Sequence, residues 1–236
     1  IDGGSRTLLG SGPTLIADTQ YLIEVHLTQP HDTAGVFQVK LNGALIIDFE
    51  GDTLTTYDST LDYASVRLGK PADYAGAAQG LYDDLAVNDA TGDRNNSWVG
   101  RGGIWPVYVT GAGDLAQFTP SAGANYECVD DVPPDDDTSY VSSDTEGHQD
   151  SYAITVPEVS GGVTAFTLWH YAKLAEAGAG NITQQLRKSS VGYDGDVKGL
   201  DTSYAYKSHT WETNPATGEP WTLAGLETFY VGQETS

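Results

Sequence analysis

Methionine is absent from the 236-residue sequence, cysteine occurs once, and basic side chains are scarce. The missing methionine indicates that Ile1 is not a natural start, so we expect a fragment, a processed product or part of a longer chain. A single cysteine, Cys128, excludes an intrachain disulfide and a cysteine-based zinc site. No apolar run approaches the roughly 20 residues that span a bilayer, and nothing at Ile1 resembles a signal peptide.

The charge balance is strongly acidic: 33 Asp and Glu residues stand against 11 Lys and Arg, for a net charge of −22. Binding to a phosphate backbone needs clustered lysine and arginine, so the composition argues against nucleic acid as a partner. It equally disfavours an anionic membrane surface. We interpret the charge as a solvated acidic surface, such as salt-adapted or extracellular proteins carry, with binding of divalent cations as the alternative.

No long segment has the 3.6-residue period of a helix, whereas apolar and polar residues alternate in short runs separated by turn signals about every 8–12 residues. This pattern predicts an all-β protein made of β-sandwiches. The best local signal is a β-hairpin over 36–49, because Asn42-Gly43 suits the two positive-φ positions of a type I′ turn. Further strands are predicted over residues 21–28, 65–69, 81–87, 98–109, 150–156, 163–173, 182–187, 202–208 and 227–234.

The stretch from Leu81 to Thr110 holds the predicted joint of the chain: a strand, a polar loop over 88–97, and a second strand rich in aromatic and β-branched residues. The acidic sequence after Thr110 is predicted to be mostly irregular, since Pro133-Pro134 precedes three aspartates. Residues 211–221, WETNPATGEPW, predict a long turn. Thr222 is a candidate N-cap for one helical turn over 223–226.

Two parts of the sequence support a family resemblance. YLIEVHLTQPHDTAGVFQVKLNGALIIDF followed by LYDDLAVND resembles the latter part of a concanavalin A-like, laminin G-type lectin jelly roll. Asn96-Ser97-Trp98, FTPSAGANYECVDDVPPDDDTSYVSS and WETNPATGEPWTLAGLETF extend the resemblance to tailed-bacteriophage structural proteins in which such a jelly roll precedes a second β domain. The resemblance implies a concanavalin A-like domain over 1–110, with further strands before Ile1, and a second β-sandwich over 111–236. It carries over no sugar-binding or calcium-binding motif.

Three carboxylates, Asp48, Glu50 and Asp52, would share one face of an unbroken strand, as the paired acids of a glycosidase do. Their order does not match the Glu-x-Asp-x-x-Glu order of glycosidases on lectin-like jelly rolls, and Gly51 is expected to end the strand. We therefore interpret them as a solvated strand end and expect no catalytic residues.

Oxygen ligands for Ca²⁺ could come from Asp83, Asp84, Asp89 and Asp93. Adjacent strand residues point to opposite faces, so Asp83 and Asp84 could share one ion only across a bulge. A structural role, with Asp83 hydrogen-bonded to loop N–H groups, is the alternative we favour. The acidic run over 130–137 lacks EF-hand spacing, and the five histidines show no metal-type pairing.

Four tryptophans flank turns or lie on predicted strands and could serve as sugar-stacking platforms: Trp105, Trp169, Trp211 and Trp221. Trp211 and Trp221 bracket a Pro/Gly turn, so we expect these two to pack against each other and fix it.

The resemblance and the absence of a catalytic motif lead to one main hypothesis: a non-enzymatic bacteriophage virion protein, either a capsid decoration or a tail or fibre component. It would act by oligomerising, as a trimer by fold analogy, and by docking on other virion proteins, with host-surface adhesion as a further role. The alternative is a secreted or surface carbohydrate-binding protein. No cofactor is expected other than the Ca²⁺ considered above.

Overall fold

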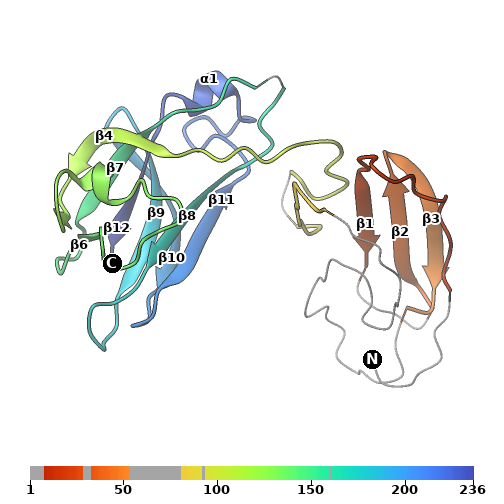
Figure 1. The fold of residues 1–236 in the computed structure, drawn as a ribbon, viewed down its shortest axis with the longest axis horizontal. Helices are drawn as coiled ribbons and strands as arrows, with labels where there is room; N and C mark the ends of the chain where they lie inside the picture. Colours follow the sequence, from red (N-terminus) through yellow and green to blue (C-terminus); the bar gives the residue numbers. More distant parts are fainter. Residues whose placement is uncertain (1–7, 29–32, 54–80, 92–93, 160) are drawn as a thin grey trace. The chain divides into compact units, whose positions relative to one another are not determined.

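The computed structural model describes residues 8–28, 33–53, 81–91, 94–159 and 161–236. The chain forms two compact units, Ile1–Ile104 and Trp105–Ser236, each described here by itself (Figure 1). This division falls near the boundary predicted after residue 110. The one α-helix in the described parts, α1 (Leu223–Leu226), is a single turn, and no described helix is long and apolar enough to cross a membrane.

The first unit contains a three-stranded antiparallel sheet in the order β1-β2-β3, formed by β1 (Ile23–Leu27), β2 (Gly35–Leu41) and β3 (Ala44–Gly51). The predicted hairpin is confirmed: Asn42 and Gly43 have φ of 50° and 83°, as a type I′ turn requires. The Asn42 side chain also accepts a hydrogen bond from the N–H of Leu22 (2.9 Å), which fixes the start of β1 against the turn.

Two strand predictions between β3 and β4 (Val109–Ala116) are wrong. Residues 81–87 form no ladder, and their apolar side chains Leu81, Leu85 and Val87 are exposed. Alternation makes a strand only where a neighbouring edge accepts its hydrogen bonds, and Asp84, with φ of 54°, interrupts the extended run. The run over 98–109 is likewise irregular until Val109, with a positive φ at Gly100. The predicted loop over 88–97 has no strand or helix among its described residues, and the strand predicted over 65–69 lies outside the described part.

The second unit is built almost entirely from antiparallel strands. A five-stranded sheet has the order β10-β9-β12-β7-β4, and two smaller sheets pair β11 with β8 and β5 with β6. The strands are β4 (Val109–Ala116), β5 (Thr119–Pro120), β6 (Val141–Ser142), β7 (Gln149–Ile154), β8 (Phe166–Ala172), β9 (Asn181–Lys188), β10 (Val191–Gly199), β11 (Ala205–Trp211) and β12 (Tyr230–Thr235), with a 3₁₀ turn η1 (Asn125–Cys128).

Most of the predicted elements of this unit are confirmed: β7, β8, β9, β11, β12 and the helical turn, whose N-cap Thr222 accepts a hydrogen bond from the N–H of Gly225 (3.0 Å). Four strands were missed. β4 and the two-residue strands β5 and β6 lie in a stretch predicted to be irregular, and β10 contains three glycines and two aspartates, which are rare in strands. The β9–β10 turn is made by Ser189 and Ser190 at φ of 51° and 66°, positions where sequence reasoning expects Asn or Gly.

The core of the second unit lies between the five-stranded sheet and the β8–β11 pair, which makes this unit a β-sandwich. It is formed by Tyr152, Phe166, Leu186, Trp211, Trp221, Leu226, Phe229 and Val231. The packing role predicted for the turn tryptophans is confirmed: both belong to this core, and Trp211 and Trp221 are only 7% and 2% exposed. The indole Nε1–H of Trp221 donates to the carbonyl of Trp211 (2.8 Å), so one hydrogen bond and two buried rings close the turn. The all-β fold class is therefore confirmed, while the jelly-roll connectivity stays a prediction.

Candidate functional site

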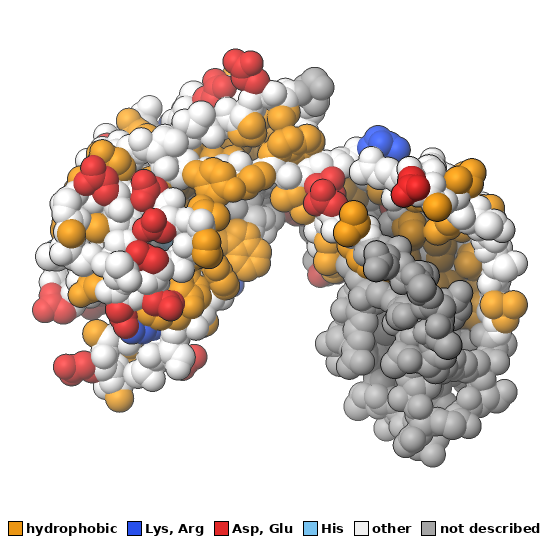
Figure 2. Space-filling view, viewed as in Figure 1, with side chains coloured by type: hydrophobic (Ala, Val, Ile, Leu, Met, Phe, Trp, Pro, Cys, Tyr) orange, Lys and Arg blue, Asp and Glu red, His pale blue; other side chains and the backbone are white. Residues whose placement is uncertain are grey.

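The β8–β11 sheet turns one face to the core and leaves the other outside. Phe166 lies in the core and Leu168 packs against it, so alternation along β8 puts Thr167, Trp169 and Tyr171 on the outer face. Their partners across the ladder are Thr210, Ser208 and Tyr206. Trp169 is 60% exposed and Tyr206 56% exposed, which is unusual for side chains of this size. Figure 2 shows hydrophobic side chains gathered over this part of the second unit.

Four rings form a continuous series on this outer face, here called the aromatic row: Trp169, Tyr206, Tyr171 and Tyr204. The Trp169 and Tyr206 rings meet edge to face, with centroids 6.2 Å apart. Tyr206 and Tyr171 are tilted at 4.7 Å, and Tyr171 and Tyr204 are stacked in parallel at 4.8 Å. Both edge-to-face and offset-stacked arrangements are favourable for aromatic pairs, so the row is a stable packed unit despite its exposure.

The tyrosine end of the row is held by the acidic loop that follows Pro134. The hydroxyl of Tyr204 donates to the carbonyl of Asp136 and to Oδ1 of Asp137, both at 3.0 Å. The hydroxyl of Tyr171 donates to Oδ1 of Asp136 (3.1 Å). Lys173 forms an ion pair with Asp137 (2.7 Å) and lies over the Tyr204 ring, 4.4 Å from its centroid. These contacts position two of the four rings.

The pKa values at this end follow from the same contacts. Burial, together with the hydrogen bond to Asp137 and the negative charge of that carboxylate, raises the pKa of Tyr204 to about 12. The hydrogen bonds that Asp137 receives from Lys173 and Tyr204 lower its pKa. The pKa of Tyr171 is raised as well, chiefly by burial and the hydrogen bond to Asp136, so both tyrosine hydroxyls stay protonated donors over the physiological range and Asp137 stays a charged acceptor.

The other end of the row carries hydroxyl groups. Thr167 and Thr210 lie opposite each other, with their Oγ1 atoms 2.8 Å apart, and Ser208 lies opposite Trp169 in the ladder. The outer face thus combines aromatic rings, aliphatic hydroxyls and two carboxylates, with no Leu, Ile or Val at its six paired positions from 167 to 171 and from 206 to 210. Such a surface can stack on the C–H face of a ring and exchange hydrogen bonds at its rim.

Sequence reasoning found only one member of this row, Trp169. The three tyrosines were missed, although Trp169/Tyr171 and Tyr204/Tyr206 each have the i, i+2 spacing that puts two side chains on one strand face. What the sequence lacks is the pairing of β8 with β11, which brings the two pairs together. Trp105, the other exposed candidate, is 52% exposed and lies apart from the ring contacts of this row.

The calcium candidates hold backbone groups. Oδ1 of Asp83 accepts from the N–H of Asp84 (2.9 Å), and Oδ1 of Asp84 accepts from the N–H of Ile104 (2.7 Å). Asp89 accepts from the N–H and hydroxyl of Thr91, and these bonds lower its pKa. Asp93 lies outside the described residues. Within the described part no three His, Cys, Asp or Glu side chains cluster as metal ligands would.

The three carboxylates with glycosidase-like spacing, Asp48, Glu50 and Asp52, do not all lie on one strand. β3 ends at Gly51, as expected, so Asp52 lies beyond it. Oδ1 of Asp48 accepts from Nε2 of Gln38 (2.7 Å) on the neighbouring strand. Three histidines likewise contact side chains of neighbouring residues: His26 contacts Gln38, His148 contacts Ser143, and His209 contacts Asp196. The Cys128 thiol is buried and donates to the carbonyl of Ala122 (2.8 Å).

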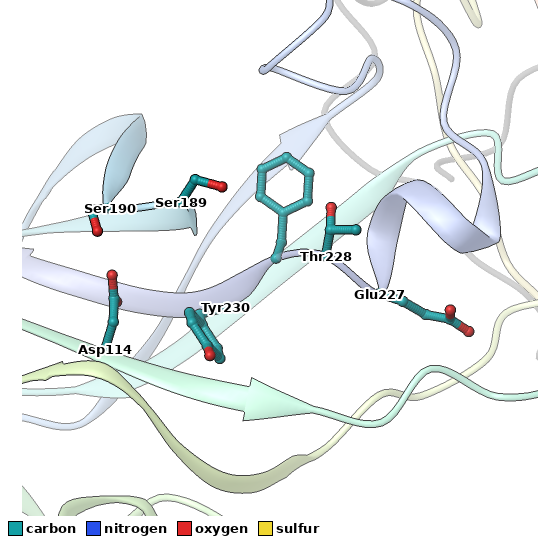
Figure 3. A pocket seen from close by; sticks show the side chains of 7 residues that line it. Asp114, Ser189, Ser190, Glu227, Thr228 and Tyr230 are labelled. Atoms are coloured by element: carbon teal, nitrogen blue, oxygen red, sulfur yellow. The ribbon is translucent and has the colours of Figure 1, made fainter.

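A hollow of about 330 Å³ lies beside the β9–β10 turn, lined by Asp114, Ser189, Ser190, Glu227, Thr228, Phe229 and Tyr230 (Figure 3). Asp114 is already engaged: Nε of Arg187 donates to its Oδ1 (3.0 Å), and the resulting hydrogen bonds lower its pKa. No histidine is among the residues that line this hollow.

A second exposed surface lies on the first unit. Ile23, Val25 and Leu27 of β1 share a face with their ladder partners Leu41, Val39 and Phe37, and this face continues onto β3 through Ile47 and Phe49. We call these eight residues the apolar sheet face. Its β1 members are 54%, 54% and 41% exposed, in chain order. On the opposite face, Trp98 packs edge-on against His26 and lies under the ammonium group of Lys40, 4.0 Å from its ring centroid.

Comparison with known proteins adds no relationship to these observations: no family model, no curated protein and no solved structure matches the chain.

Proposed function

We propose that the chain is a non-enzymatic structural component of a bacteriophage virion, a capsid decoration or a part of the tail or fibre. It acts by forming a homo-oligomer and by docking on other virion proteins. The apolar sheet face of β1–β3 is the observation that carries this proposal. The resemblance of both halves of the sequence to tailed-phage structural proteins supports the same role, and a trimer is expected by fold analogy.

The apolar sheet face suits a protein partner because its exposed members are aliphatic and contiguous. Covering such a side chain completely stabilises a complex by about 1.5–3 kcal/mol, so the exposed half of each β1 residue offers about 1 kcal/mol. Contiguous apolar surface is typical of protein contact sites. β1 is also the edge of the three-stranded sheet among the described residues, and an edge strand can pair with a strand of another chain.

The net charge of −22 restricts what can dock there. Two such chains repel each other at low ionic strength, whereas salt near 0.1 M screens exposed charges beyond about 10 Å. Contacts through an uncharged aliphatic face are compatible with this acidity because no like charges need be brought together at the contact itself.

A charge placed in the apolar sheet face tests the proposal. We expect Val25→Glu to reduce both self-association in sedimentation experiments and incorporation of the chain into assembled particles, because docking would bury the new carboxylate. His26→Glu is the matched control, since it introduces the same group on the same strand but on the opposite face. Equal incorporation of wild type and Val25→Glu, or equal loss with both variants, would contradict docking through this face.

A second candidate, a secreted or surface carbohydrate-binding protein, is favoured by one specific observation, the exposed aromatic row of the second unit. Host-surface adhesion by a virion component would use the same surface. Binding to a glycan array, lost on changing one tryptophan, distinguishes this role from a scaffold that binds proteins alone.

A further inference from the structure

We propose that the aromatic row on β8–β11 is a binding site for a neutral saccharide chain, with Trp169 as the main stacking platform. This binding role develops the adhesion part of the proposed function and rests on it, but it is independent of docking through the apolar sheet face. Nothing in the resemblance carries a sugar site onto these residues, so the geometry of the row carries the proposal.

The four rings are not equivalent. Tyr171 and Tyr204 lie parallel, with an interplanar angle of 10°, so each covers one face of the other. Trp169 and Tyr206 meet at 84°, which leaves indole surface uncovered, and Trp169 is the most exposed of the large aromatics on β8 and β11. A sugar ring stacks on one open aromatic face, and the indole offers the largest. Tyr206 then serves as a side wall and the tyrosine stack as its support.

The row is organised before any ligand arrives. Asp136 and Asp137 fix the hydroxyls of Tyr171 and Tyr204, and the ladder from Ala205 to Trp211 fixes Tyr206 opposite Tyr171. Tyrosine and tryptophan have only two side-chain torsions, so ordering them costs little entropy. A preorganised platform spends less of its interaction energy on ordering, which matters for weak ligands such as sugars.

The groups at the rim define the class of ligand. Hydroxyls of Thr167, Thr210 and Ser208 can donate to or accept from sugar hydroxyls at one end. Asp136 and Asp137 accept at the other end, and the charge of Lys173 is already paired with Asp137. Two carboxylates on a chain of net charge −22 repel uronic or sialic acids. A neutral saccharide does not experience this repulsion.

The same comparison favours a saccharide over a protein partner at this face. Its paired positions carry rings and hydroxyls and no aliphatic side chain, in contrast to the apolar sheet face of the first unit, where Ile, Val and Leu are exposed. The hydroxyl groups beside the rings can exchange hydrogen bonds with a polyol, because each both donates and accepts. A cationic peptide could also meet the acidic rim, and it is treated as a contrary outcome of the test.

The test uses the full chain and a panel of immobilised oligosaccharides, with cellohexaose, laminarihexaose, maltohexaose and α-mannan as neutral probes and polygalacturonate and oligolysine as charged comparisons. We expect binding to at least one neutral probe, with little dependence on salt, and none to polygalacturonate. Trp169→Ala should weaken that binding about tenfold, which is the loss of one aromatic contact. Trp105→Ala is the matched control, because it removes another exposed tryptophan of the same unit, 52% exposed against 60% for Trp169, that lies outside the row.

Absence of binding to every neutral probe overturns the proposal, and so does salt-sensitive binding to oligolysine alone. Equal loss in Trp105→Ala and Trp169→Ala overturns the assignment to this row. Tyr206→Phe, which keeps the ring, should retain binding and confirms that the β8–β11 sheet folds. The docking proposal fails separately: Val25→Glu should leave saccharide binding unchanged, and Trp169→Ala should leave particle incorporation unchanged.

Discussion

Asp150 is a buried hydrogen-bond acceptor that links several segments of the second unit. Its carboxylate is completely buried on β7 and accepts four hydrogen bonds. Oδ1 accepts from the N–H groups of Gln117 (2.6 Å) and Phe118 (2.8 Å). Oδ2 accepts from Nδ2 of Asn125 (2.6 Å) and from the hydroxyl of Tyr152 (2.9 Å). One side chain thus holds the loop after β4, the turn η1 and the end of the core.

Asp150→Asn keeps the shape and removes two acceptor sites. If the amide oxygen replaces Oδ1, the new NH₂ group faces two other donors, Asn125 and Tyr152. In the reverse orientation the NH₂ group faces the backbone N–H groups of Gln117 and Phe118, which cannot turn away. Hydrogen bonds to a charged group are worth about 1.5–3 kcal/mol each, so losing two predicts a loss of about 3–6 kcal/mol. That is a large part of the 5–15 kcal/mol by which a typical domain is stable.

Hydrogen–deuterium exchange by mass spectrometry suits this test, because peptides of β7 and β12 report on the second unit alone. We expect Asp150→Asn to speed exchange in both strands by at least a hundredfold. Asp144→Asn is the control, since it makes the same change on an exposed carboxylate that bonds only locally to Thr145. The reasoning would be refuted if the amides of β7 and β12 in Asp150→Asn kept exchange protection within about 1 kcal/mol of wild type. Equal acceleration of exchange in Asp150→Asn and Asp144→Asn would refute it as well.

Two further predictions concern buried polar groups. Gln184 is fully buried on β9, and neither polar atom of its side-chain amide has a hydrogen-bond partner among the described residues. Gln184→Met should therefore raise the free energy of unfolding, measured by urea denaturation, by about 1–2 kcal/mol. A lower free energy of unfolding would show that the amide is hydrogen-bonded. Burial lowers the pKa of His170 to about 4. Because the unfolded ring takes up a proton near pH 6.5, stability should fall by up to about 1.4 kcal/mol per pH unit from pH 6.5 to 4. His170→Leu should flatten that dependence, and an unchanged pH profile of Tm would argue against it.

The hairpin at Asn42-Gly43, the turn between Trp211 and Trp221 and the N-cap Thr222 could be predicted from the sequence because each depends on local chemistry. Positive-φ residues, bracketing aromatics and a capping hydroxyl act within a few residues. The same holds for β7, β8, β9, β11 and β12, where alternation separates an apolar from a polar face.

The errors arise where partners are distant in sequence. The alternation over 81–87 is as regular as in β7, yet no strand of the described residues pairs with it. β4 and β10 have weak strand propensity and form because β7 and β9 offer an edge. The acceptor role of Asp150 is equally invisible, because its donors come from residues 117–125. Only part of the aromatic row could be predicted: the i, i+2 spacings can be read from the sequence, but the pairing of Tyr171 with Tyr206 cannot.

The two exposed surfaces differ in chemistry, and this difference separates the two proposed roles. Aliphatic side chains on β1 fit a protein partner, and rings with hydroxyl neighbours on β8–β11 fit a saccharide. A virion component that docks through one unit and adheres through the other would use both.

Quantitative mass spectrometry of virus particles purified from the biological source of this chain tests the central proposal most directly. The account predicts that the chain is present at high copy number and in a fixed ratio to the major capsid or tail protein. Its absence from purified particles, with the chain found free in the lysate, would contradict the virion role.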